Sequence, residues 1–310
     1  MADVFVIGVD IGATNIRVAR SDMHGKVLKM IKVKNKAIEN PPILPLLVAD
    51  LIREVGEEGV GAIGVGSIGP LRVSDGSIIP PNLGNRPIKI KPELERIFDI
   101  PVFLTNDCIS AVIAEKLLGE GKNYDNLVYI TFSTGIGAGV IVDGKILSGK
   151  DGNAHEVGHL VLDVDDRVRC KCGGYSHWEA FCSGSSIIPY ASFLSDKLHL
   201  PELGAKTPEA LFKLAREGNQ IAQIVTERCA LINAAGIASV INAYDPSLVT
   251  IGGSLALLNP DFYEPMLGNL QQFLTNRMPK AYLTDLGEDI VLKGALEIAK
   301  DPGIIQRGFN

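Results

Sequence analysis

The feature that most constrains the fold is a strand–turn–strand pattern that occurs twice in the 310-residue chain. The first copy has an apolar run at 4–9, a polar turn at 10–15 and a renewed apolar pattern from Ile16. The second has an apolar run at 128–132 and a glycine-rich turn at 133–139 before a returning strand. A repeated supersecondary unit is typical of an internally duplicated protein. Domains usually have about 150 residues, so the length of the chain and the repeated pattern together predict two domains.

The segments that follow the first copy predict an α/β layer. A third strand at 27–33 alternates apolar residues with lysines, and such an antiparallel meander does not open a Rossmann fold. Apolar residues at helical spacing occupy 47–55, and a buried strand follows at 61–66. Helix followed by strand is the succession found in α/β domains. In the second half, a long helix is expected at 220–243 and a short strand at 247–251.

A polar break at 118–126 contains two glycines, Asn123 and Asp125, and we place the domain boundary there. The prediction is a smaller N-terminal α/β domain at 1–120, completed by a C-terminal helix at 294–310. A larger C-terminal α/β domain is expected at 121–293.

Composition excludes several classes of protein. A net charge of −6, with 46% apolar and 21% charged residues, is that of a globular protein and disfavours disorder and polybasic nucleic-acid binding. No apolar run reaches the ~20 residues of a membrane span, and the start of the chain lacks the basic region of a signal peptide. We therefore expect a cytoplasmic protein without a nucleic-acid or membrane partner. A homo-oligomer stays open, because no interface can be read from the sequence.

Three polar turns are candidates for binding a nucleotide. The turn at 10–15 could surround a phosphate with N–H groups while its aspartate holds hydrated Mg²⁺, although a plain hairpin turn would use the same residue types. The turn at 133–139 lacks the lysine of a P-loop. The glycine pair at 252–253 could admit an adenine or simply join a strand to a helix. The candidate residues are Asp10, Gly12, Ala13, Thr14, Asn15, Thr134, Gly135, Gly137, Gly252 and Gly253.

Asn106 and Asp107 follow an apolar strand at 102–104 and precede a helical pattern. An aspartate in that place either caps the helix, which is worth ~1 kcal/mol, or acts as a general base directed into a cleft. The residues taken alone favour the cap.

The densest group of reactive side chains lies at 155–179. Cys170 and Cys172 are one residue apart, with His177 five residues later and His159 eleven residues earlier. These four are the nitrogen and sulfur ligands of a structural Zn²⁺ site, against the alternative of surface histidines and buried thiols. Five cysteines are an odd number for a disulfide scaffold. Carboxylates beside a metal-pinned loop, at Glu156 and Glu179, would suit sugar hydroxyls.

Taken together, these residues resemble the ROK family (repressor, open reading frame, kinase), specifically its ATP-dependent sugar kinases. The resemblance covers nearly the whole chain. The segments 10–15 and 133–139 look like the two phosphate motifs and Gly252-Gly253 the adenosine motif. Asn106-Asp107 looks like the sugar and catalytic-base pair. The sugar-binding and zinc motifs are matched by Glu156-x-Gly158-His159 and by Cys170-x-Cys172-Gly173 with Glu179.

One departure concerns the zinc signature, which in the family usually reads CxCGxxGCxE. This chain has Ser176-His177 where the family has Gly-Cys. Because a histidine nitrogen binds zinc as a thiolate does, we expect a Cys₂His₂ site. Its ligands would be His159, Cys170, Cys172 and His177.

The resemblance implies two RNase H-like domains, as in the actin-like ATPase superfamily, that close around a hexose and MgATP. It implies phosphorylation of the sugar 6-hydroxyl, with Asp107 as the base and Mg²⁺ near Asp10. Cofactors are then ATP, Mg²⁺ and structural Zn²⁺. The sugar-binding residues implied are Gly66, Ser67, Asn82, Asn106, Asp107, Glu156, His159 and Glu179.

Two alternatives belong to the same family. N-acetylmannosamine and N-acetylglucosamine kinases share these motifs, and Glu156 and Glu179 make us favour glucose over an N-acetylhexosamine. A sugar-responsive repressor would carry a helix-turn-helix before the first phosphate motif, which here begins at Asp10. We therefore expect a glucokinase or hexokinase rather than a repressor that lacks its DNA-binding domain.

Overall fold

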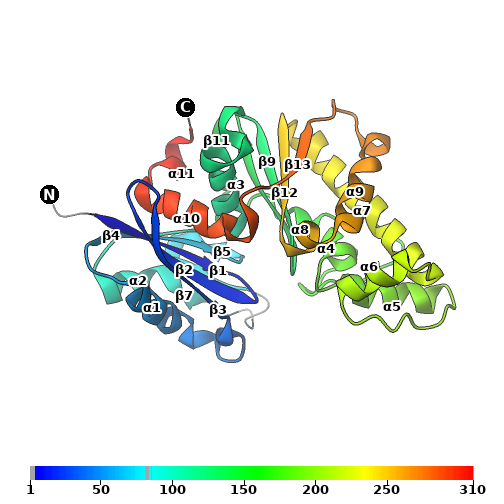
Figure 1. The fold of residues 1–310 in the computed structure, drawn as a ribbon, viewed down its shortest axis with the longest axis horizontal. Helices are drawn as coiled ribbons and strands as arrows, with labels where there is room; N and C mark the ends of the chain where they lie inside the picture. The colour runs from blue at the N-terminus through cyan, green and yellow to red at the C-terminus, as the bar shows by residue number, and fades with distance from the viewer. Residues whose placement is uncertain (1–3, 81–83, 85, 310) are drawn as a thin grey trace. The chain divides into compact units, whose positions relative to one another are not determined.

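The computed structural model describes residues 4–80, 84 and 86–309 and has the expected α/β class (Figure 1). The chain groups into two compact units. The first unit comprises Met1–Leu127, Gly139–His155 and Glu288–Asn310, and the second comprises Val128–Ala138 and Glu156–Gly287. This grouping by contacts differs from the division made on the sequence in placing 139–155 with the first unit. The domain boundary near 118–126 stays a prediction.

The first unit is built on a five-stranded sheet of order β3-β2-β1-β4-β8. The predicted meander of three antiparallel strands is present, and β4 and β8 continue the sheet parallel to β1. Its strands are β1 (Phe5–Ile11), β2 (Asn15–Asp22), β3 (Val27–Lys34), β4 (Val60–Ser67) and β8 (Val102–Asn106). A small antiparallel sheet adds β5 (Leu71–Arg72), β6 (Ser77–Ile78) and β7 (Ile88–Lys89).

Helices cover both faces of this sheet, because successive side chains of β1 point to opposite faces. Ile7 and Val9 are fully buried in a cluster with apolar residues of α1 (Leu44–Val55) and α2 (Ile90–Phe98). Val6 packs instead with α10 (Ile290–Lys300). Figure 1 shows α1 and α2 on one side of the sheet and α10 on the other. The helix α3 (Asp107–Leu118) packs against α10.

The C-terminal segment is helical but has different bounds from the predicted helix at 294–310. Helix α10 begins at Ile290 and ends at Lys300, and a separate short helix, α11 (Ile304–Arg307), follows. Pro302 lies between them, and proline lacks the N–H that a continuous helix needs. Gly294 permits close contact between α10 and α3, since a Cβ there would lie 1.7 Å from the Ser110 carbonyl oxygen.

The second sheet has the order β11-β10-β9-β12-β13. Three strands consecutive in sequence are followed by two later ones, as in the first sheet, so the repeat in the sequence is also a repeat of strand order. The strands are β9 (Leu127–Phe132), β10 (Ile136–Val142), β11 (Lys145–Ile146), β12 (Leu248–Gly252) and β13 (Lys280–Leu283).

The glycine-rich turn predicted at 133–139 is shorter than expected. Strand β10 already begins at Ile136, so Gly137 and Gly139 are strand residues and the turn is Ser133–Gly135. A Cβ on Gly139 would lie 2.0 Å from the Cys108 carbonyl oxygen. The glycine there permits close packing, which a sequence pattern does not distinguish from a turn.

The helices of the second unit pack around α7 (Gln220–Tyr244), which was expected at 220–243. Among the described helices, α7 alone is long and apolar enough to cross a membrane, and 56% of its apolar window is buried. It contacts α4, α5, α6 and α9, so it is placed as the core helix of this unit. The other helices are α4 (Trp178–Cys182), α5 (Ile187–Lys197), α6 (Pro208–Arg216), α8 (Ser254–Leu258) and α9 (Pro260–Gly268).

Candidate active site

The carboxyl ends of three parallel strands bring predicted site residues together in the first unit. In the register of β1 and β4, Asp10 lies opposite Gly66, and in that of β4 and β8, Ser67 lies opposite Asn106. Asp107 follows directly as the first residue of α3. In α/β sheets, ligands bind outside the carboxyl ends of the strands. This edge is therefore where a substrate of the first unit is expected.

The first polar turn, Gly12–Thr14, joins β1 to β2 and is held by its own backbone and by Asn35. The N–H of Gly12 donates to the Asn15 carbonyl at 2.9 Å, and Asn35 donates from Nδ2 to the Gly12 carbonyl at 2.8 Å. Among the described residues, none accepts a hydrogen bond from the N–H of Ala13 or Thr14. These two groups are available to a phosphate oxygen. Asn35, which is buried, was not singled out from the sequence.

Asp10 is paired with Arg17, a second residue that sequence reasoning missed. Nη1 of Arg17 lies 2.8 Å from Oδ2 of Asp10, and the same guanidinium reaches Glu288 and Asp289 at 3.1 Å. Burial raises the pKa of Asp10 to about 6, against the opposing effect of Arg17. The register of the β1–β2 hairpin places Asp10 opposite Arg17. That register is the signal by which the pair could have been found.

The structure corrects the capping role considered for Asp107. The N-cap of α3 is Asn106, whose Oδ1 accepts from the Cys108 N–H at 2.8 Å. Asp107 is the first helical residue, and its Oδ1 lies 2.8 Å from the same N–H. Helix α3 thus has a cap without Asp107.

The remaining residues of the sugar set in the first unit differ in what they can offer. Ser67 is fully buried and donates from Oγ to the Ile68 carbonyl at 3.1 Å. A Cβ on Gly66 would lie 2.7 Å from Ser110 Oγ, so this glycine permits packing against α3 and can offer only backbone groups. Asn82 lies outside the described residues.

The second polar turn, Ser133–Gly135, and the residue that follows it form three hydrogen bonds with the segment around α4. Oε2 of Glu179 accepts from the Ile136 N–H at 3.0 Å. The N–H groups of Gly184 and Ser185 donate to the carbonyls of Ser133 and Thr134 at 2.8 and 3.2 Å. Glu179, expected at a sugar hydroxyl, therefore accepts a hydrogen bond from the residue that follows this turn.

The glycine pair ends β12 and begins α8. Gly253 has a φ of 86°, a conformation that favours glycine, and a Cβ there would lie 2.2 Å from the Phe132 carbonyl oxygen. A Cβ on Gly252 would lie 2.5 Å from the hydroxyl oxygen of Tyr129. Both glycines thus allow the end of β12 to pack against β9, as in a strand-to-helix turn. Their contact with an adenine stays a prediction.

The four predicted metal ligands are brought together. The ligand atoms of His159, Cys170, Cys172 and His177 all lie within 4.8 Å of one another. Tetrahedral zinc, with bonds of about 2.0–2.3 Å, would place its ligand atoms roughly 3.3–3.8 Å apart, so shifts of about 1 Å are sufficient. Nδ1 of His159 is buried and has no hydrogen-bond partner among the described residues, as expected of an atom that awaits a ligand.

The pKa shifts of this cluster act in opposite directions on metal binding. Burial, followed by the nearby His159, lowers the pKa of His177 and keeps its imidazole in the neutral form that coordinates a metal. Burial raises the pKa of Cys170 to about 12, so a metal would have to displace its proton. Partial desolvation raises the pKa of Glu156, with His159 acting against it and Glu179 adding to it. The N–H of His159 donates to the Glu156 carbonyl at 3.0 Å, so Glu156 lies beside the metal cluster.

We expect the purified protein to contain about one zinc per chain by elemental analysis. His177→Cys should retain the metal, because it restores the thiolate of the family pattern, and His177→Ala should lower the zinc content severalfold. His24→Ala, at an exposed histidine of the first unit, is the control and should leave the zinc content unchanged. Active protein that is free of zinc would contradict the assignment.

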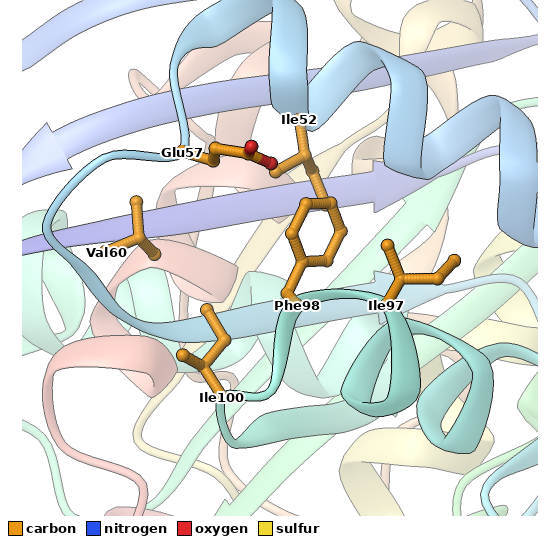
Figure 2. Close-up of a pocket in the computed structure, with 6 residues that line it drawn as sticks. All are labelled: Ile52, Glu57, Val60, Ile97, Phe98 and Ile100. Carbon is orange, nitrogen blue, oxygen red and sulfur yellow. The ribbon is translucent and has the colours of Figure 1, made fainter.

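A cavity of about 160 Å³ in the first unit is separate from these residues. Figure 2 shows its lining, which is apolar except for the carboxylate of Glu57. Val60 lies at the amino end of β4, the opposite end from Ser67. A sugar needs several polar partners, so this cavity is not a candidate for the substrate. The residues that line it are Ile52, Glu57, Val60, Ile97, Phe98 and Ile100.

Comparisons with known proteins point in one direction. The model of the ROK family matches residues 6–301. A glucokinase of Pyrobaculum calidifontis is 36% identical over 305 residues, which cover 97% of each chain. The crystal structure of a ROK family glucokinase from Streptomyces griseus in complex with glucose and AMPPNP has a TM-score of 0.79 at 26% identity, covering 96% of this chain and 99% of that one. A ROK hexokinase from Thermus thermophilus has a TM-score of 0.78 at 30% identity, covering 96% and 98%.

Proposed function

The chain belongs to the ROK family, and on that premise we propose that it is a sugar kinase that transfers the γ-phosphoryl group of ATP to the 6-hydroxyl of a hexose. The observation that carries the proposal is the carboxyl edge of the first sheet. There the register of β1, β4 and β8 brings the end of β1, Ser67 and Asn106 to one edge, where the Gly12–Thr14 turn and Asp107 follow in the chain. The glucokinases and hexokinases to which the chain is similar support the same reaction class.

Asp107 is proposed as the general base. Its carboxylate would take the proton from the sugar 6-hydroxyl as that oxygen forms a bond to the γ-phosphorus. The bond between the γ-phosphorus and the bridging oxygen breaks, and the electron pair leaves with ADP. Asp107 suits this role by its place, because it is the first residue of α3, at the carboxyl edge where the substrate is expected.

The nucleotide is proposed to bind at the three polar turns. The N–H groups of Ala13 and Thr14, which have no acceptor among the described residues, and the turn at Ser133–Gly135 suit phosphate oxygens, and Gly252-Gly253 suits the adenosine. Arg17 engages Oδ2 of Asp10, so Oδ1 is the atom that could accept from the water of a hydrated Mg²⁺. Bound there, the ion would neutralise charge that develops on the phosphates.

The sugar is proposed to be oriented by amide, carboxylate and imidazole groups. Asn106 uses Oδ1 as a cap, which leaves its Nδ2 to donate to a hydroxyl. Glu179 uses Oε2 at Ile136, which leaves its other oxygen to accept. With one ring nitrogen on zinc, His159 would keep the other for a hydroxyl, and Glu156 lies in the same group. The zinc would be structural and would hold this loop in shape.

The proposed location is the cytoplasm, because thiols stay reduced there and the five cysteines of the chain are free.

The proposed substrate is glucose. We expect ADP release with MgATP and glucose, and at least about tenfold lower kcat/KM with N-acetylglucosamine and N-acetylmannosamine, since a site shaped for a sugar hydroxyl discriminates against the bulkier N-acetyl group. A coupled ADP-release assay over a panel of hexoses measures this. A preference for an N-acetylhexosamine would reassign the substrate. If no sugar of the panel supported ADP release, the proposal would be overturned.

A further inference from the structure

We propose that α4 couples the metal cluster to the phosphate turn of the second unit, with Glu179 as the positioning residue. The phosphate turn is Ser133–Gly135, and the metal cluster is His159, Cys170, Cys172 and His177. The inference rests on the proposed function for the identity of the ligand, ATP. It goes beyond that function in assigning to the metal loop an effect on nucleotide affinity as well as on sugar binding.

The metal cluster is joined to α4 directly along the chain. His177, a member of the cluster, is the residue immediately before α4 and serves as its N-cap position. The N–H of Trp178 donates to the Leu160 carbonyl at 2.8 Å, and the N–H of Leu162 donates to the Ser176 carbonyl at 3.0 Å. The segment after His159 is thus hydrogen-bonded to the segment that begins α4. A metal bound to both histidines would lock these two segments together.

Residues in α4 and directly after it form hydrogen bonds on both sides of the phosphate turn. Glu179, on the first turn of α4, accepts from the Ile136 N–H at 3.0 Å, and a Cβ on Gly135 would lie 2.4 Å from the same carboxylate oxygen. Beyond the end of α4, Gly184 and Ser185 donate to the carbonyls of Ser133 and Thr134.

The segment that ends at His159 also touches the residue that follows this turn. A Cβ on Gly158 would lie 2.1 Å from the Ile136 carbonyl oxygen. The peptide groups on both sides of Ile136 are therefore contacted from the loop and from α4.

Helix α4 has only five residues, and its first residue packs tightly against α7, so we expect the two ends of the helix to move together. Trp178 is fully buried and donates from Nε1 to Oδ1 of Asn233 at 2.8 Å. Its ring lies against Gly236 of α7, where a Cβ would come within 2.4 Å of the indole. Close-packed groups of this kind transmit strain rather than absorb it. A shift of the metal loop should therefore displace the carboxylate of Glu179 and the phosphate turn.

The coupling has a measurable consequence that does not need turnover. Removing zinc from the full-length protein with a chelator should weaken the binding of Mg–AMP-PNP, a non-hydrolysable ATP analogue, by about tenfold in calorimetry. Coupling between two binding sites is reciprocal. Saturating AMP-PNP should consequently raise the zinc affinity, measured by competition with the chelator, by the same factor. Trp178 is the only tryptophan of the chain, so its fluorescence should respond to either ligand.

Variants of Glu179 test the residue itself. Glu179→Ala removes a charge-assisted hydrogen bond and should raise the Kd of Mg–AMP-PNP by about tenfold or more. Glu179→Gln keeps an acceptor of the same shape and should give a smaller, few-fold increase with the zinc content of the wild type. The control is Glu227→Gln on α7, which makes the same chemical change at an exposed position and should leave the Kd within twofold.

The outcomes separate this coupling from the sugar kinase activity. If Glu179→Gln retains zinc and neither this variant nor zinc removal alters the Kd of Mg–AMP-PNP, while the KM for sugar rises, the metal loop serves the sugar alone and the coupling is overturned. If the protein binds AMP-PNP with the predicted dependence on zinc yet phosphorylates no hexose, the coupling stands and the proposed function fails.

Discussion

Asp107→Asn is expected to lower kcat by about 10²-fold or more while the Kd values for glucose and for Mg–AMP-PNP stay near those of the wild type. The amide cannot accept the proton of the 6-hydroxyl, but it has the same shape as the carboxylate. The N-terminus of α3 should persist, because Oδ1 of Asn106 caps it at 2.8 Å. Steady-state kinetics and calorimetry make the measurement.

A matched control is Asp99→Asn, which makes the same change at an exposed residue of the first unit. Asp99 is the C-cap residue that follows α2 and has a φ of 54°, a conformation that asparagine adopts well. This variant should keep the kcat of the wild type. If Asp107→Asn also kept most of its turnover, Asp107 would serve only in the first turn of α3, and the general base would have to be sought elsewhere.

Gly64→Ala should destabilise the protein by about 3 kcal/mol, because overpacking at a rigid contact costs roughly 1–3 kcal/mol and this contact is closer than most. A Cβ on Gly64 would lie 1.9 Å from the carbonyl oxygen of Ala295 and 3.1 Å from the backbone nitrogen of Ala299. Both neighbours belong to the backbone of α10, so relief requires the helix to move away from the sheet. The midpoint of urea unfolding should fall accordingly.

Gly61→Ala in the same strand is the control for the loss of glycine's flexibility. A Cβ there would lie 3.1 Å from the tip of Val4, an exposed side chain that can move aside. This variant should unfold within about 1 kcal/mol of the wild type. Equal unfolding midpoints for Gly64→Ala, Gly61→Ala and the wild type would show that α10 does not pack on β4 as closely as described.

Patterns within short stretches of the sequence were sufficient to predict several strands and helices and the metal site. Alternation of apolar and polar residues located the meander, helical spacing located α1 and α7, and both features arise from the period of the chain itself. The spacing of Cys170, Cys172 and His177 pointed to one metal site because ligands a few residues apart are close in any compact loop. The order of the motifs along the chain sufficed to identify the family, which the comparisons confirm.

The tertiary structure alone decided what depends on contacts between distant segments. The register of β4 and β8 places Ser67 opposite Asn106, and strand pairing is a property of the sheet rather than of either strand. The hydrogen bond between Glu179 and Ile136 spans 43 residues, and no period in the sequence encodes it. The glycines of β10 were mistaken for a turn, since a missing side chain marks close packing only once its neighbour is known. The sequence thus determined which residues could do chemistry, and packing between distant segments determined which of them meet.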